Sequence, residues 1–239
     1  MAGTGPPQEF QRICTRNGLV LSESQLVLLT RFVDGLLEWN SKINLVSRRD
    51  QENIWFSHVL HSLTLLFYVE FPDGLRVLDL GTGGGFPGIP LAIARPDFEL
   101  VLLDSIRKKT VAVQDLVDRL GLTGVSVCTG RAEQVHSIHP AAGTFDLVVA
   151  RAVSSLRDLV RWSRPYLRVS LTPPVETSEV TRTKFTSPGL IALKGGDLEK
   201  EIAEARIKES IRFVRVIGMS FEGSIELGLE DKKAVIVKL

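Results

Sequence analysis

Apolar residues in the second two thirds of the chain fall into short β-prone runs, and patterns with helical spacing separate most of them. The runs predict strands at residues 76–80, 98–103, 125–128, 145–149, 190–193, 213–217 and 234–237. Helices are predicted at 89–95, 106–120 and 197–210. This alternation is typical of a doubly wound, mostly parallel α/β sheet. Only a loop separates the last two strands, so we expect them to pair antiparallel.

The N-terminal part of the chain has helical spacing throughout. Ser22 followed by Gln25 resembles a capping box, and apolar residues continue after it at helical spacing. Asp50 is expected to cap a further apolar helix. We therefore predict a helical cap, residues 1–72, in the same globule as a sheet domain, residues 73–239.

Residues 170–188 differ from the rest of the sheet domain. They are rich in Thr, Ser and Pro and have no periodicity. We expect an exposed, mobile loop before the fifth strand, although a loop of this length can also close over a site.

Composition indicates a globular protein with one sizeable core. The chain has 239 residues, 44% of them hydrophobic, and a formal net charge of +1. With a charge so near neutral, an RNA partner requires basic side chains gathered on one face. No apolar run approaches the ~20 residues that span a bilayer, and no signal-peptide pattern is present. Cys14 and Cys128 have no metal spacing, so we expect reduced thiols, no bound metal and a cytoplasmic location.

The stretch 75–90, LRVLDLGTGGGFPGIP, predicts the functional site. An apolar strand leads into a run that contains Gly81, Gly83 and Gly85, and a helical pattern follows. Glycine has no Cβ, so the chain can turn sharply here and bring its backbone against a ligand. Strand, glycine loop and helix in this order form a nucleotide-type site at the carboxyl end of a parallel strand.

The residues around this loop favour a cationic cofactor over a dinucleotide. Dinucleotide sites have the pattern G-x-G-x-x-G, whereas Phe86 occupies the third glycine position here. Asp79 precedes the first glycine by two residues, where its carboxylate would repel a pyrophosphate. It either attracts an ammonium group or braces the loop backbone. Both roles fit S-adenosylmethionine, which carries a sulfonium and an ammonium group but no phosphate.

An acidic residue also ends the second predicted strand. Asp104 lies about 20 residues after the glycines, where an acid commonly binds ribose hydroxyls. It can alternatively cap the helix that follows. The spacing favours the ribose role.

Several segments resemble one protein family. They are LDLGTGGGFPGIPLAIARPD, LLDSIRKK, FDLVVARAVSSL and ALKG, with Asn44–Leu45, His58, Ser62–Leu63 and residues 130–133. Together they are similar to the bacterial small-subunit ribosomal RNA guanine-N7 methyltransferases, also called glucose-inhibited division protein B, over roughly residues 20–239. The most specific parts are GTGGGFPGIPL and the Ala150-Arg151-Ala152 step.

The resemblance implies a class I, Rossmann-like methyltransferase domain that uses S-adenosylmethionine. It implies N7 of one guanine in small-subunit ribosomal RNA as the methyl acceptor. The partner is then that RNA or the small ribosomal subunit, and no obligate protein partner is evident. The expected cofactor-binding residues are Gly81, Phe86, Ala132, Glu133 and Arg151, to which we add Gly83 and Gly85 of the same loop and Asp104.

Basic residues near the predicted sheet edge are candidates for positioning and for RNA contact. Arg151 follows the fourth strand, where it could bind the cofactor carboxylate, a phosphate or guanine O6, or form a structural ion pair. We expect it to position the reactants. Arg157 and Arg161 belong to a run at helical spacing that either follows phosphates or forms a solvated face. Lys194 ends the fifth strand and either faces RNA or is an ordinary surface lysine.

Guanine N7 has a lone pair and no proton, so methyl transfer to it needs no base. Catalysis should come from positioning and electrostatics. His58 and His61 lie on a largely apolar helix and are expected to be packed or capping residues rather than ligands.

Three classes of function compete. A methyltransferase is favoured, acting on small-subunit ribosomal RNA or on another RNA. An NAD-dependent dehydrogenase is disfavoured by Phe86 and Asp79. A non-catalytic module that binds S-adenosylmethionine is disfavoured because it would not need the intact glycine loop, Asp104 and Arg151.

Overall fold

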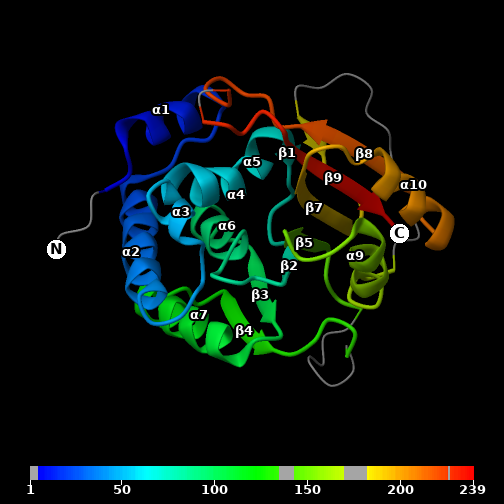
Figure 1. The fold of residues 1–239 in the computed structure, drawn as a ribbon, viewed down its shortest axis with the longest axis horizontal. Helices are drawn as coiled ribbons and strands as arrows, with labels where there is room; N and C mark the ends of the chain where they lie inside the picture. Colours follow the sequence, from blue (N-terminus) through cyan, green and yellow to red (C-terminus); the bar gives the residue numbers. More distant parts are fainter. Residues whose placement is uncertain (1–4, 135–142, 170–181, 226) are drawn as a thin grey trace.

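A twisted seven-stranded sheet forms the centre of the protein (Figure 1), seen in a computed structural model that describes residues 5–134, 143–169, 182–225 and 227–239. The strand order is β4-β3-β2-β5-β7-β9-β8. The strands are β2 (Arg76–Leu80), β3 (Glu99–Asp104), β4 (Val125–Thr129), β5 (Leu147–Arg151), β7 (Gly189–Gly195), β8 (Phe213–Gly218) and β9 (Lys232–Lys238). All the strands expected from the apolar runs are therefore confirmed.

The direction of the strands sets where a ligand can bind. β2 pairs parallel with both β3 and β5, while β9 is antiparallel to β7 and β8. The chain proceeds outward to β3 and β4 on one side of β2 and to β5 and β7 on the other. Such a switch point leaves a crevice at the carboxyl ends of the central strands. Here that edge carries the residues that follow Leu80, Leu103 and Ala150.

Side chains alternate between the two faces of the sheet and build two apolar cores. One face carries Val77, Leu102 and Val149, and the other carries Leu78, Leu103 and Val148. Helices α6 (Gly88–Ala94) and α7 (Arg107–Leu120) cover the first face, and α9 (Leu156–Ser163) and α10 (Glu199–Lys208) cover the second (Figure 1). Strands buried on both faces read as nearly continuous apolar runs, which is why the sequence predicts them well.

The N-terminal helices pack on the same face as α6 and α7. They are α1 (Gln8–Arg16), α2 (Glu23–Asn40), α3 (Arg48–Gln51), a π-helical turn η1 (Trp55–Leu60), α4 (His61–Leu63) and α5 (Leu65–Tyr68). Phe10, Leu29 and Phe32 belong to the same apolar core as the sheet residues of that face. The expected capping box is confirmed, because Ser22 and Gln25 exchange side-chain and backbone hydrogen bonds at the start of α2.

The expected role of Asp50 as a helix cap is wrong. Ser47 caps α3 and accepts a hydrogen bond from the Asp50 backbone N–H, so Asp50 lies inside the first turn. The Asp50 carboxylate instead accepts a hydrogen bond from the Ser47 hydroxyl at 2.7 Å. The same carboxylate oxygen lies 3.6 Å from Nε2 of His58, in the neighbouring turn η1.

The described part of the segment 170–188 is only partly exposed: Lys184 and Thr186 are exposed, whereas Phe185 and Ser187 are buried. Residues 170–181 of the predicted loop lie outside the described residues. Beyond them, β6 (Thr183–Lys184) pairs with β1 (Val69–Glu70) in a separate two-stranded sheet. Phe185 is buried beside Phe71, with ring centroids 5.5 Å apart. β1 and β6 have two residues each, so neither strand is long enough to show a periodic pattern in the sequence.

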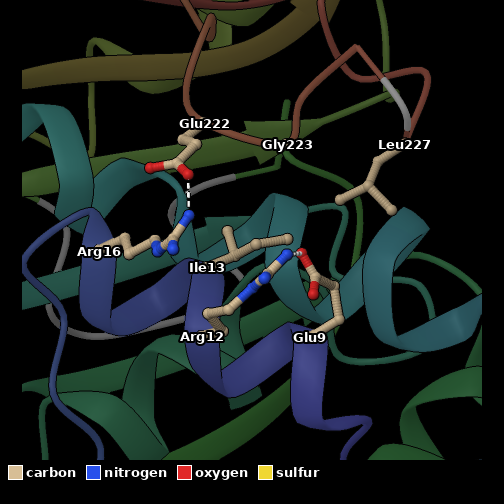
Figure 2. Close-up of a pocket in the computed structure, with 7 residues that line it drawn as sticks. All are labelled: Glu9, Arg12, Ile13, Arg16, Glu222, Gly223 and Leu227. Atoms are coloured by element: carbon tan, nitrogen blue, oxygen red, sulfur yellow. Dashed lines mark hydrogen bonds and ion pairs between the residues drawn. The ribbon is translucent and has the colours of Figure 1, made fainter.

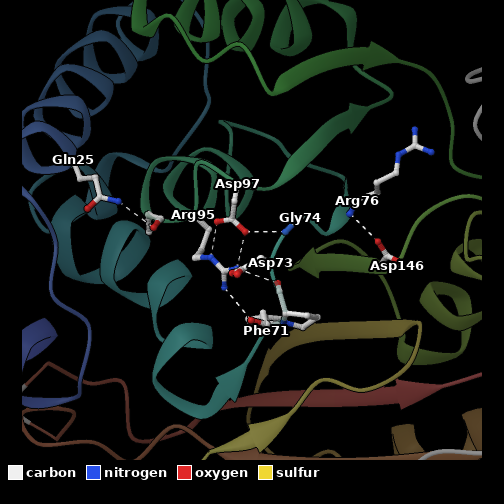
Figure 3. A network of polar contacts seen from close by, with 10 residues as sticks. Gln25, Phe71, Asp73, Gly74, Arg76, Arg95, Asp97 and Asp146 are labelled. Atoms are coloured by element: carbon white, nitrogen blue, oxygen red, sulfur yellow. Dashed lines mark hydrogen bonds and ion pairs between the residues drawn. The ribbon is translucent and has the colours of Figure 1, made fainter.

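The Arg95 side chain fastens the segment just before β2 to the end of α6. The guanidinium of Arg95, at the end of α6, donates to the carbonyl of Phe71 and pairs with Asp97 and Asp73 (Figure 3). These bonds hold the connection between the cap and β2 at the amino ends of the strands, away from the predicted site.

The segment that follows β8 contacts the first helix. A hollow of about 270 Å³ lies between α1 and this segment (Figure 2). Its charged groups pair with one another, Arg16 with Glu222 and Arg12 with Glu9. Ile13 lies between these pairs and belongs to the core.

Candidate active site

The glycine loop turns sharply at the end of β2. Gly81 and Thr82 donate their N–H groups to the carbonyl of Leu103 at 2.8 and 2.9 Å. Gly81 and Gly83 have φ of 78° and 58°, which side chains other than glycine rarely adopt. A Cβ at Gly83 would meet nothing closer than the Gly81 carbonyl oxygen at 4.0 Å, so backbone is presented there to open space.

Asp79 braces this loop from below. Its carboxylate is fully buried and accepts hydrogen bonds from the Thr82 hydroxyl at 2.7 Å and from the Gly88 N–H at 2.9 Å. Burial raises the pKa of Asp79 to about 7, against the lowering effect of these two bonds. Of the two roles that the sequence left open, the structure shows the bracing one. It shows no direct path from this carboxylate to a ligand, because Asp79 does not line either pocket described below.

Asp104 ends β3 beside the glycine loop. Its carboxylate accepts the N–H of Gly83 at 2.9 Å and the N–H of Ile106 at 2.8 Å. No side chain caps α7. Asp104 contributes to the start of this helix only by accepting the N–H of Ile106, the residue before its first turn. A carboxylate has about four acceptor positions, so two such bonds leave capacity for a ligand.

A first hollow, here called the glycine-loop pocket, lies above these residues. Its volume is about 400 Å³. Its lining includes the loop residues Gly81, Thr82, Gly83, Gly84 and Phe86, the β3 end with Asp104, Ser105, Ile106 and Lys109, the cap residues Leu45, Val46, Ser47 and His58, and Arg151, Ala152 and Val153 after β5. The glycine loop, Asp104 and Arg151, expected from the sequence to share a site, are thus brought together.

Three of the expected cofactor residues do not line this pocket. A Cβ at Gly85 would collide with Ile89, so this glycine serves packing within the loop. Ala132 is buried, and its carbonyl accepts a hydrogen bond from the Tyr166 hydroxyl at 3.1 Å. Glu133 is exposed on the turn that follows. Contact of these three with a cofactor stays a prediction.

Arg151 leaves the end of β5 and packs on Phe86. The guanidinium lies 4.9 Å from the centroid of the Phe86 ring, which is itself buried against Phe32. Burial lowers the pKa of Arg151 to about 10, and the charges of Asp79 and Asp50 oppose this shift. The guanidinium therefore keeps its charge at neutral pH.

His58 holds the other side of Arg151. Its ring Nδ1 and an Nη2 of Arg151 form a hydrogen bond, and its Nε2 lies 3.6 Å from the Asp50 carboxylate. Arginine can only donate, so Nδ1 accepts and the proton of the neutral ring is on Nε2, facing Asp50. Burial, followed by the charge of Arg151, lowers the pKa of His58 to about 4.

The expectation that His58 is only a packed or capping residue is therefore incomplete. It contacts Phe86, with ring centroids 4.9 Å apart, and it lines the pocket as well as holding Arg151. Its spacing in the sequence gives no sign of this, since Arg151 is 93 residues away. His61 is buried, as expected.

A second hollow, here called the cap-side pocket, lies on the other side of Arg151. Its volume is about 690 Å³, and its lining comes from α3, η1, the end of β7 and the segment before β9. His58, Arg151 and Ala152 line both pockets and so form the wall between them. Ala152 has φ of 53°, an uncommon value for a residue with a side chain, and such backbone often occurs at functional sites.

The expected RNA-binding residues differ in position. Lys194 lines the cap-side pocket, where its ammonium bonds the Ser154 carbonyl and the Glu201 carboxylate, both at 2.6 Å. Arg157 pairs with Glu204 at 3.1 Å and Arg161 with Asp158 at 3.0 Å on α9, and neither lines either pocket. Their contact with RNA stays a prediction.

The described ranges contain no group of three or more His, Cys, Asp or Glu side chains arranged to hold a metal ion. In the same part of the chain, no helix combines the length and the apolar character needed to cross a membrane.

Comparison with known proteins fits this geometry. The family described as rRNA small subunit methyltransferase G matches residues 25–172. A ribosomal RNA small subunit methyltransferase G of Chlorobium luteolum is 39% identical over 199 residues, which cover 83% of this chain and 74% of that protein. Its counterpart in Chlorobaculum tepidum is 34% identical over 231 residues and 96% of both chains.

Solved structures support the fold. The CurJ carbon methyltransferase superposes with a TM-score of 0.54 at 13% identity, over 98% of this chain and 71% of that one. The expected class I, Rossmann-like fold is confirmed by this likeness and by the mostly parallel sheet. The chain is a methyltransferase and belongs to the rRNA small subunit methyltransferase G family.

Proposed function

We propose that this protein transfers a methyl group from S-adenosylmethionine to N7 of a guanine in small-subunit ribosomal RNA. The observation that carries the proposal is the wall formed by Arg151 and His58, which separates a glycine-loop pocket from a second pocket. Guanine N7 must contact the methyl carbon directly as the S–C bond of the donor breaks, so the donor and the acceptor in these adjoining pockets have to meet beside the Arg151 side chain. The names of the relatives support ribosomal RNA as the acceptor.

The glycine-loop pocket fits S-adenosylmethionine. The open space beside the Gly83 backbone leaves room for a ligand that a Cβ would exclude. Asp104 supplies carboxylate acceptors for ribose hydroxyls, and Lys109 and Arg151 supply positive charge for the carboxylate of the amino-acid part. When bound, S-adenosylmethionine supplies an electrophilic methyl group on a sulfonium.

The residues of the wall match a reaction that needs no base. Guanine N7 attacks with its own lone pair, so no residue has to remove a proton from it. His58 agrees with this, because Arg151 already occupies its Nδ1 and its Nε2 carries the proton. Arg151 is fixed by the Phe86 ring and by His58, and we assign it the positioning of the two reactants.

The test is mass analysis of nucleosides after incubation of the protein and S-adenosylmethionine with small ribosomal subunits that lack the modification. We expect 7-methylguanosine at one position. Protein-free small-subunit RNA and an unrelated transfer RNA, assayed in parallel, identify which form of RNA is the substrate. Methylation of the transfer RNA alone would show that another RNA is the acceptor. Binding of S-adenosylmethionine with no methylated product in any reaction would indicate a non-catalytic binding module.

A further inference from the structure

The cap-side pocket carries positive charge that no contact in the described residues uses. Arg49, on α3, and Lys232, at the start of β9, both line it, and no described residue forms an ion pair or side-chain hydrogen bond with either. Lys194 is already balanced by Glu201. Asp50, the carboxylate in this lining, faces Ser47 and His58. The two free cations are therefore available for an anionic ligand.

The deeper part of the pocket has a different character. Leu193 and Leu229 are 2% and 4% exposed, and the His61 ring is buried beside them in the lining. Burial, with the charges of Arg151 and Lys232, lowers the pKa of His61 to about 3, so its ring is neutral. A planar, uncharged group can therefore pack against Leu193, Leu229 and His61, while an anionic group can bind near Arg49 and Lys232.

A nucleotide combines these two parts. Its base is planar and its phosphates are anionic, and about 690 Å³ lies within the size range of ligand pockets. A base stacked in a helix cannot reach across to the donor, whereas an extruded base placed in this pocket meets the wall of Arg151 and His58. The Arg151 guanidinium, which lines this pocket, can then donate to the carbonyl oxygen O6 of guanine, and adenine has no acceptor at that position.

We propose that the cap-side pocket receives the acceptor guanosine extruded from its RNA stack, with Arg49 and Lys232 binding the phosphates beside it. This inference rests on the proposed function and assigns its RNA-binding side. It places the phosphate contacts on α3 and β9, in addition to any that the arginines of α9 make. Arg49 of α3 and Lys232 of β9 thus contact the substrate RNA strand from two sides of the pocket.

The test uses Arg49→Gln, Lys232→Gln and the double variant, with Lys208→Gln, an exposed residue of α10 outside both pockets, as the matched control. Methylation of unmodified small subunits is measured at several salt concentrations. We expect each single variant to raise KM for subunits about fivefold to tenfold. We expect it to lower the slope of log KM against log salt by about 0.7 to 0.9, the value of one lost phosphate contact. The affinity for S-adenosylmethionine and kcat should stay within about twofold, because no phosphate contact reaches the glycine loop.

Extrusion has its own measurement. With 2-aminopurine in place of the acceptor guanine, binding of the wild-type protein should raise its fluorescence, and the double variant at equal RNA occupancy should raise it less. Unchanged KM and salt slope in both single variants, with an active wild type, would overturn the assignment of this pocket. Unchanged fluorescence on wild-type binding would overturn extrusion. A wild type that binds S-adenosylmethionine but methylates no subunits would instead refute the proposed function.

Discussion

The contact between Arg151 and His58 determines what the site can do at the scale of single residues. A charged guanidinium is held by an aromatic ring on one side and by a neutral imidazole acceptor on the other. Asp50 lies near the far nitrogen of that imidazole and favours the tautomer that can accept. The three residues form a chain of contacts that ends at Arg151, between the glycine-loop pocket and the cap-side pocket.

Replacing Arg151 tests this arrangement. We expect Arg151→Ala to lower the rate of methyl transfer about 100-fold, the scale of losing one preorganised charged donor. Arg151→Lys should recover little, because a lysine cannot bond His58 and stack on Phe86 at once. Single-turnover methylation measures the effect, and Arg215→Ala, on the exposed side of β8, is the control. A wild-type rate in Arg151→Ala, with an unchanged melting temperature, would contradict the positioning role.

Gly81 offers a second test. A Cβ there would lie 2.5 Å from the side chain of Val153, and φ of 78° disfavours any side chain. We expect Gly81→Val to displace the turn and to weaken binding of S-adenosylmethionine by at least about tenfold, roughly 1.4 kcal/mol. Calorimetric titration measures this loss.

The control for Gly81→Val is Gly121→Ala at the end of α7. Gly121 has a similar φ of 69°, but a Cβ there would meet no atom within 4 Å. The Gly121→Ala variant measures the effect of placing a side chain on a positive-φ backbone, without the collision that a Cβ at Gly81 makes with Val153. Cofactor affinity that falls equally in both variants would show that the position of Gly81 in the loop is not the cause.

The sequence predicts those site residues that act through backbone or through the end of a single strand. Gly81, Gly83 and Asp104 follow apolar strands, and their places at the sheet edge follow from the parallel topology. His58 was missed as a functional residue, because its role depends on Arg151, which is distant in the chain and close only after folding. Pairwise contacts of this kind leave no periodic signal in one sequence.

At the scale of elements, the buried strands were predicted best and the short cap elements worst. β2, β5 and β7 are apolar on both faces, so each forms a continuous apolar run that can be recognised as a strand in the sequence. The region after Ser47 divides into α3, the π-helical turn η1 and two further short helices. His58 of η1 contacts Phe86 and Arg151, and tertiary contacts of this kind are not encoded in local propensity.

The capping box of α2 links local sequence to the position of the glycine loop. The Gln25 side chain accepts from the Ser22 N–H and also donates to the carbonyls of Ile93 and Ala94, at the end of α6. We expect Ser22→Ala to lower the free energy of unfolding by about 1 kcal/mol through the lost cap. Urea unfolding measures this, with Thr123→Ala in an exposed turn as the control. Equal stability of the two variants would show that the cap contributes nothing.

At the scale of the whole molecule, burial of titratable groups beneath the site makes stability depend on pH. His58 and His61 are neutral in the folded protein, with pKa values lowered to about 4 and about 3. Asp79 has the opposite behaviour, with its pKa raised to about 7. Between pH 7 and pH 5 the unfolded chain gains protons at the histidines that the folded chain does not, and the folded chain gains one at Asp79. The first effect destabilises on acidification and the second stabilises.

Removing one histidine should therefore flatten this dependence. Each histidine costs about 2 kcal/mol between pH 7 and pH 5, and Asp79 returns about 2 kcal/mol, so these three groups together lower the stability by about 2 kcal/mol. We expect His61→Leu to lose about 2 kcal/mol less than the wild type over this interval, whatever its stability at pH 7. Urea unfolding at both pH values measures the difference. Equal losses in the two proteins would mean that His61 is protonated in the fold, and that the neutral depth of the cap-side pocket does not exist.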